Sequence, residues 1–184
     1  QRKTKGSSVM NYQPIPSYLK EYAHALTLIR VEINKKRYKG THKQRTGTKQ
    51  SKLLGEVDRE YYTEYLGILG ELLVRHYYET NPEFSSYKAS TFIKGTRSVK
   101  DDTDLTVVKN GESQRISIKT CEYSFKANCR AMDRETSDIV VFLLFVSPEK
   151  YIVADYKPEE VKLWEVKHSY SPYYELHPDQ FGTS

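Results

Sequence analysis

DLTVVKNGESQRISIKT, residues 104–120, is the stretch that decides the fold of this chain. Apolar and polar residues alternate in both halves of the stretch, and the halves are joined at Asn110-Gly111. Asn-Gly between two such runs is a strong local signal for a tight β-hairpin. We therefore predict two neighbouring antiparallel strands, with Asp104 on the first and Lys119 on the second.

The side chains that this hairpin brings together have the chemistry of a metal-dependent phosphodiesterase. A carboxylate and an ammonium group, with a third acid from a nearby helix, can hold Mg²⁺ against a phosphate and activate water. Glu71, in the predicted helix 57–78, is the candidate third acid. Each residue also has an ordinary interpretation, because an Asp or Lys at a strand edge is often only solvated and Arg75 lies at i+4 from Glu71. Lys119 favours the functional interpretation, because it interrupts a run typical of a buried strand, where an unpaired ammonium is costly.

This spacing resembles the pattern of the PD-(D/E)xK nuclease superfamily, over roughly residues 58–147. The resemblance implies an α/β fold with a restriction endonuclease-like core, in which helices flank a mixed central β-sheet. It also implies that Asp104 is the metal-binding Asp, Lys119 the catalytic Lys and Glu71 the helical Glu. The backbone carbonyl of Ile118 would be a further ligand, and the cofactor would be one or two Mg²⁺ ions.

The chain departs from the family pattern at Ser117, where the family usually has Asp or Glu. A serine hydroxyl is a neutral and weak Mg²⁺ ligand, so a negative charge has to come from elsewhere. Some restriction endonucleases of the superfamily carry Ser-x-Lys and take the acid from the helix after the Lys strand. The matching window here contains Asp133, and Glu135 follows two residues later; both are candidates, and both also fit a solvated helix end.

Charge is distributed unevenly along the chain. Residues 1–52 contain thirteen Lys and Arg and two acids, a net charge of +11, whereas residues 53–184 carry −6. Eight basic residues without an acid fall within a stretch rich in Gly and Thr, which is typical of a mobile loop. They are Lys35, Lys36, Arg37, Lys39, Lys43, Arg45, Lys49 and Lys52. We predict that they bind the phosphates of double-stranded DNA, and a solvated basic linker is the alternative.

The remaining elements follow from periodicity and turn signals. We expect a helix from Ser17, as its N-cap, to about residue 36, a strand at 84–93, and a helix or loop at 122–135. The apolar run 138–146 predicts a central strand buried on both faces, which pairs with 151–155. A short helix begins at Pro158, and the tail from residue 170 receives no assignment.

Length and composition limit the class of protein. The chain has 184 residues and 38% hydrophobic residues, which suits one globular domain divided into a basic helical and loop extension, 1–56, and a nuclease core with a C-terminal tail, 57–184. It contains no run of eighteen apolar residues, so we expect no membrane span. Cys121 and Cys129 form no metal or disulfide motif, which favours a reducing, cytoplasmic location and argues against structural zinc.

We predict a Mg²⁺-dependent endodeoxyribonuclease. Little of the chain remains for reading bases once the core and the basic arm are assigned. A chain that consists of little more than a catalytic core and a basic arm resembles the small, single-strand-cutting subunit of a heterodimeric type IIS restriction endonuclease, whose larger subunit recognises the DNA. A self-sufficient homodimeric restriction enzyme, or a phage or repair nuclease, is the first alternative. A non-catalytic DNA-binding or assembly protein on a decayed nuclease fold is the second, and Ser117 favours it.

Overall fold

The computed structural model describes residues 9–89, 104–122, 127–129, 136–166 and 173–176. The helices and strands of these residues are β1 (Val9–Pro14), α1 (Ser17–Arg37), β2 (Thr48–Ser51), β3 (Gly55–Asp58), α2 (Arg59–Thr80), β4 (Phe84–Ala89), β5 (Leu105–Lys109), β6 (Glu112–Glu122), β7 (Ala127–Cys129), β8 (Ile139–Ser147), β9 (Lys150–Tyr156), α3 (Pro158–Lys162), β10 (Glu165–Val166) and β11 (Tyr173–Leu176).

The predicted hairpin is confirmed and is formed by β5 and β6. Asn110 and Gly111 have φ angles of 52° and 78°, the left-handed values that a two-residue hairpin turn requires. The strands are antiparallel, with Leu105 opposite Ile116. The strand β6 continues to Glu122, well past the point where β5 begins.

The hairpin belongs to a six-stranded mixed sheet with the order β1-β9-β8-β6-β5-β4. The pair β6 and β8 is parallel, and the other neighbours are antiparallel. Every residue from Val140 to Phe145 of β8 is buried, which confirms the central strand predicted from the apolar run. The predicted α/β fold with a mixed sheet flanked by helices is therefore correct at this level.

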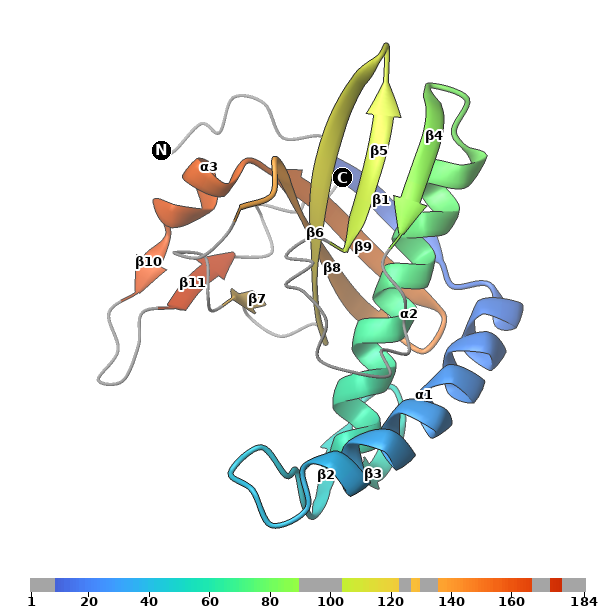
Figure 1. Cartoon of the computed structure of the whole chain (residues 1–184), viewed down its shortest axis with the longest axis vertical. Helices are drawn as coiled ribbons and strands as arrows, with labels where there is room; N and C mark the ends of the chain where they lie inside the picture. The colour runs from blue at the N-terminus through green and yellow to red at the C-terminus, as the bar shows by residue number, and fades with distance from the viewer. Residues whose placement is uncertain (1–8, 90–103, 123–126, 130–135, 167–172, 177–184) are drawn as a thin grey trace.

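The two faces of the sheet are covered differently (Figure 1). On one face α2 packs on the sheet and α1 packs on α2, in a core that includes Leu69, Ile116 and Leu143. On the other face Phe142 and Trp164 belong to a second core, beside α3 and the small sheet β10-β11-β7. The alternation of side chains along β6 and β8 supplies both cores.

The two long helices lie close to their predicted positions. The helix α1 begins at Ser17, but Pro16 is its N-cap residue and Ser17 makes no capping hydrogen bond, so the predicted capping role is wrong. Proline suits this position because it has no backbone N–H to satisfy. In α2 the N-cap is Asp58, whose carboxylate accepts from the backbone N of Tyr61 at 3.1 Å.

Several short strands were not predicted. The expected helix or loop at 122–135 contains β7, and the unassigned tail contains β11. The basic stretch is not a single loop, because α1 extends through Arg37 and β2 begins at Thr48. Such strands have only two to six residues, too few to show a period. The domain boundary at residue 56 stays a prediction, although β1 pairs with β9 and α1 packs on α2.

Among the helices in the described part of the chain, none combines the length and the apolar character needed to cross a membrane.

Candidate active site at the end of the β5–β6 hairpin

Asp104 meets β6 at the point where β5 begins. Its backbone N donates to the carbonyl of Ile116 at 3.1 Å, and its carboxylate Oδ2 accepts from the backbone N of Ile118 at 2.7 Å. The carboxylate thus replaces the backbone acceptor that a longer β5 would have offered to β6. This hydrogen bond is what an ordinary residue at a strand end would make with the neighbouring strand. The same bond also holds the carboxylate next to Ile118, between Ser117 and Lys119 in the sequence.

Ser117 and Lys119 share the face of β6 that lies away from α2. They stand beside Val140 and Phe142 of β8, and both of these residues belong to the core on that face. Ser117 is only 2% exposed, and Lys119 is partly buried. The structure therefore brings four predicted site residues to one end of the hairpin: Asp104, Ser117, Ile118 and Lys119.

Glu71 belongs to α2, which packs on the opposite face of the sheet from Lys119. A Cβ added to Gly70 would lie 2.0 Å from Cγ2 of Thr120, so glycine is what allows α2 to approach this closely. Glu71 follows Gly70, so its backbone lies close to Thr120. Its Oε2 is 3.4 Å from Nη2 of Arg75, and these side chains are 18% and 16% exposed. Arg75, the residue at i+4 that the sequence suggested as a partner for Glu71, therefore forms an ion pair with it.

The remaining candidate acids, Asp133 and Glu135, lie outside the described residues. Within the described ranges there is no cluster of three or more His, Cys, Asp or Glu side chains that could hold a metal ion. The candidate ligand groups of Asp104, Ile118 and Ser117 are all oxygens: a carboxylate, a backbone carbonyl and a hydroxyl. Oxygen donors suit Mg²⁺, which is commonly bound through one or two carboxylates together with water and substrate phosphates. The set fits Mg²⁺ with one carboxylate, and a second has to come from Glu71, Asp133 or Glu135.

Seven of the eight predicted DNA-binding residues are exposed lysines or lie at the exposed C-terminus of α1. Lys35, Lys36 and Arg37 form its last turn. Some of them make weak surface contacts, as Lys36 does with Glu32 at 3.4 Å and Lys49 does over the ring of Tyr62 at 4.3 Å. Such surface contacts stabilise little and are readily exchanged for phosphate contacts.

Arg45 differs from the other seven. Its Nη1 lies 3.2 Å from Oε1 of Glu60 and 3.4 Å from Oε1 of Glu64, and Glu60 is only 2% exposed. Asn34 also donates to Glu60, at 2.8 Å, and Arg30 contacts Glu64 at 2.7 Å. A buried carboxylate needs such partners. We therefore assign Arg45 a structural role, holding the connection between α1 and β2 on α2. The signal in the sequence was the pair of acids four residues apart on α2.

Glu122 is a residue that the sequence interpretation missed. Its carboxylate accepts a hydrogen bond from the hydroxyl of Ser51 and another, at 3.3 Å, from the backbone N of Leu53. Burial, and then the nearby Glu122 carboxylate, raise the pKa of Tyr62 well above its ordinary value. These contacts join the β2–β3 hairpin to the end of β6, three residues after Lys119.

The β2–β3 hairpin, at the end of the basic stretch, therefore adjoins the C-terminal end of β6, the half of the strand that carries Lys119 (Figure 1). Nothing in the sequence pattern showed this connection, since residues 51 and 122 are far apart along the chain. Comparison with known proteins found no matching family model, no matching curated protein and no matching solved structure.

Proposed function

We propose that this chain is a Mg²⁺-dependent endodeoxyribonuclease with a restriction endonuclease-like core of the PD-(D/E)xK kind. The observation that carries the proposal is the hydrogen bond from the backbone N of Ile118 to Asp104, 2.7 Å long, which sets a carboxylate between Ser117 and Lys119 at the open end of a hairpin. The parallel pairing of β6 with the buried strand β8 holds that end in place.

The proposed roles follow from the chemistry of each group. Asp104 and the carbonyl of Ile118 would hold the metal, with a further acid from Glu71, Asp133 or Glu135. The bound ion would stabilise charge on the scissile phosphate and lower the pKa of a bound water. Lys119 would orient that water or help to deprotonate it. Ser117 would contribute a hydrogen bond at most, because its hydroxyl is neutral.

Double-stranded DNA is the proposed substrate because of the basic surface. Lys49 and Lys52 belong to the β2–β3 hairpin, which the contact of Ser51 with Glu122 joins to the end of β6, three residues after Lys119. The other exposed basic residues of the set, Lys35, Lys36, Arg37, Lys39 and Lys43, precede this hairpin in the chain. Lysines spaced along a surface bind phosphates and release counterions without selecting a base sequence. Arg45 is left out of this set, because it is held by the Glu60 carboxylate.

We further propose that a larger, DNA-recognising subunit directs this chain, as in a heterodimeric type IIS restriction endonuclease. The described part of the chain contains the main sheet, α1, α2 and the β2–β3 hairpin. Its other elements are α3, which has five residues, and the three short strands β7, β10 and β11. These pieces are small for an element that reads bases in the major groove. A self-sufficient homodimer and a phage or repair nuclease remain the alternatives with the same chemistry.

A plasmid nicking assay tests the proposal. Supercoiled DNA is incubated with the purified chain, with and without its co-purified proteins, in Mg²⁺ or in EDTA. We expect nicking that requires Mg²⁺, is lost in Lys119→Met and is kept in the control Lys150→Met, which removes an exposed lysine of β9. Nicking that survives in Lys119→Met would contradict the site. DNA binding without nicking in any arm would support the non-catalytic alternative.

A further inference from the structure

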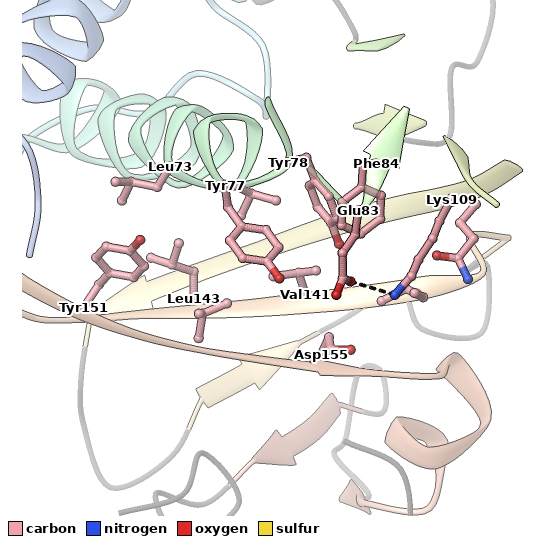
Figure 2. Close-up of a pocket in the computed structure, with 14 residues that line it drawn as sticks. Leu73, Tyr77, Tyr78, Glu83, Phe84, Lys109, Val141, Leu143, Tyr151 and Asp155 are labelled. Carbon is pink, nitrogen blue, oxygen red and sulfur yellow. Dashed lines mark hydrogen bonds and ion pairs between the residues drawn. The ribbon is translucent and has the colours of Figure 1, made fainter. Parts of the chain in front are cut away.

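A cavity of about 410 Å³ lies between the C-terminal half of α2 and the sheet (Figure 2). Its floor includes Val141 and Leu143 of β8, which belong to the core on the α2 side of the sheet. Lys119 stands beside Phe142, which belongs to the core on the other side. The cavity is therefore across the sheet from the candidate active site, and the proposed nuclease chemistry does not use it.

Most of the lining is apolar. It includes Leu73 and Val74 of α2, Phe84 of β4 and Val153 of β9. Tyr77 of α2 is 39% exposed, and Figure 2 shows its ring directed toward the strands, so this ring lies at the mouth of the cavity. A cavity of this size with mainly apolar walls and a few polar groups is typical of a small-molecule site.

Tyr78 is the most deeply buried polar residue of the lining, with only 9% of its surface exposed. Its ring packs edge to face on Phe84, with ring centroids 4.6 Å apart, and Figure 2 shows the side chain directed from α2 toward the strands. Within the described part of the chain, its hydroxyl has no hydrogen-bond partner. A buried donor that lacks a partner costs free energy. A molecule in the cavity can remove this cost by accepting from the hydroxyl.

The charged side chains of the described lining are not available to a charged ligand. Lys109 Nζ lies 2.9 Å from Glu83 Oε2, so these two form an ion pair (Figure 2). Asp155 has a partner as well. A cation or an anion would lose hydration on entering the apolar walls, and no unpaired charge of the described lining would compensate for that loss. The lining therefore favours an uncharged ligand.

We propose that this cavity binds an uncharged small molecule that has an apolar body and a hydrogen-bond acceptor, such as a ketone. The apolar walls cover the body of this ligand, and the Tyr77 ring covers it at the mouth. The Tyr78 hydroxyl donates to the acceptor and fixes the orientation of the ligand. Burial raises the pKa of Tyr78, so its hydroxyl keeps the proton that it donates.

Two probes of one shape test the hydrogen bond: acetophenone, which has a carbonyl oxygen, and α-methylstyrene, which has a methylene group in its place. Binding to the full chain is followed by titration of backbone amide signals in NMR spectra of wild type and Tyr78→Phe. This variant removes only the hydroxyl and keeps the ring against Phe84. We expect it to weaken acetophenone binding about fivefold, the effect of one hydrogen bond, and not to weaken α-methylstyrene binding.

The location and the charge requirement are tested on wild type. Nuclear Overhauser effects should connect acetophenone with the methyl groups of Leu143 and Val153. Benzoate and benzamidine, an anion and a cation of similar shape, should each bind at least about tenfold more weakly than acetophenone. The control Tyr22→Phe removes an exposed hydroxyl of α1 outside the cavity, and it should change the binding of neither neutral probe.

Three results would overturn the proposal. The first is that Tyr78→Phe leaves acetophenone binding unchanged or weakens both neutral probes equally. The second is that benzoate or benzamidine binds as tightly as acetophenone. The third is that acetophenone shows no contact with Leu143 or Val153. If Tyr78→Phe does not fold, the charge series and these contacts in wild type decide.

Discussion

Replacing Gly70 by alanine should destabilise the protein, although alanine is the better helix former. The added Cβ would lie 2.0 Å from Cγ2 of Thr120, so helix and strand must separate by about 1.5 Å to restore normal contact. Overpacking of this kind costs about 1–3 kcal/mol, and the helix propensity of alanine returns about 1 kcal/mol. The cost falls at the upper end of that range because Thr120 is β-branched and its side chain is stiff. We expect a net loss of about 1–2 kcal/mol and a fall in Tm of about 2–8 °C.

Thermal and urea unfolding measure the effect, and Gly67→Ala is the matched control. Gly67 lies in the same helix, but a Cβ added there would meet no atom within 4 Å, so alanine at this position should stabilise by about 0.5–1 kcal/mol. In a Thr120→Ala background, Gly70→Ala should cost at least about 1 kcal/mol less than in wild type. If Gly70→Ala is as stable as Gly67→Ala, or if its cost is the same in both backgrounds, the close approach of α2 to β6 is wrong.

Three further predictions concern charged and buried groups. Arg45→Ala should cost about 1–2 kcal/mol, because it removes a partner from the buried Glu60 carboxylate. Hydrogen bonds from Arg115 lower the pKa of Asp138 below its ordinary 3.8, so this stabilisation is present above pH 3.8 and is lost as the pH falls through the lowered value. Urea unfolding should therefore show a weaker acid dependence in Asp138→Asn. Ser117→Asp should destabilise the chain in EDTA. Mg²⁺ should then raise its Tm, and should raise its free energy of unfolding by about 2.7 kcal/mol when Mg²⁺ is about 100 times Kd.

The controls for these predictions come from the same surfaces. Lys43→Ala removes an exposed charge and should leave stability unchanged while it weakens DNA binding and reduces the salt slope by about 0.9. If Arg45→Ala is as stable as Lys43→Ala, the structural role of Arg45 is wrong and Arg45 belongs with the predicted DNA-binding residues. Identical acid unfolding of wild type and Asp138→Asn would refute the role of the Arg115 contact. A Tm of Ser117→Asp that does not respond to Mg²⁺ would place the metal elsewhere.

The local parts of the fold could be predicted from the sequence. Asn110-Gly111 determined the hairpin, because few other residue pairs adopt positive φ twice in succession. The apolar run that became β8 showed a strand buried on both faces. The hairpin then brought Asp104 to Ile118 without further information, since register follows from the turn.

The parts that depend on distant residues could not be predicted. The contact of Ser51 with Glu122 joins positions about seventy residues apart, and neither residue has a local signal. The role of Arg45 depends on Glu60 being buried, which composition and charge counting do not reveal. The cavity that is lined by Tyr77 of α2, Leu143 of β8 and Asp155 of β9 likewise forms only when α2 packs on these strands.

The most direct test of the central claim compares cleavage and binding in Asp104→Asn. Asparagine keeps an acceptor oxygen for the backbone N of Ile118, so the hairpin should remain folded while the negative charge is lost. Plasmid nicking rate in Mg²⁺ and DNA affinity are measured on one preparation, with the larger subunit present if wild type needs it. We predict a nicking rate at least about 100-fold lower and a DNA Kd within about twofold of wild type. Nicking by Asp104→Asn within about threefold of wild type would contradict the assignment of this carboxylate to catalysis.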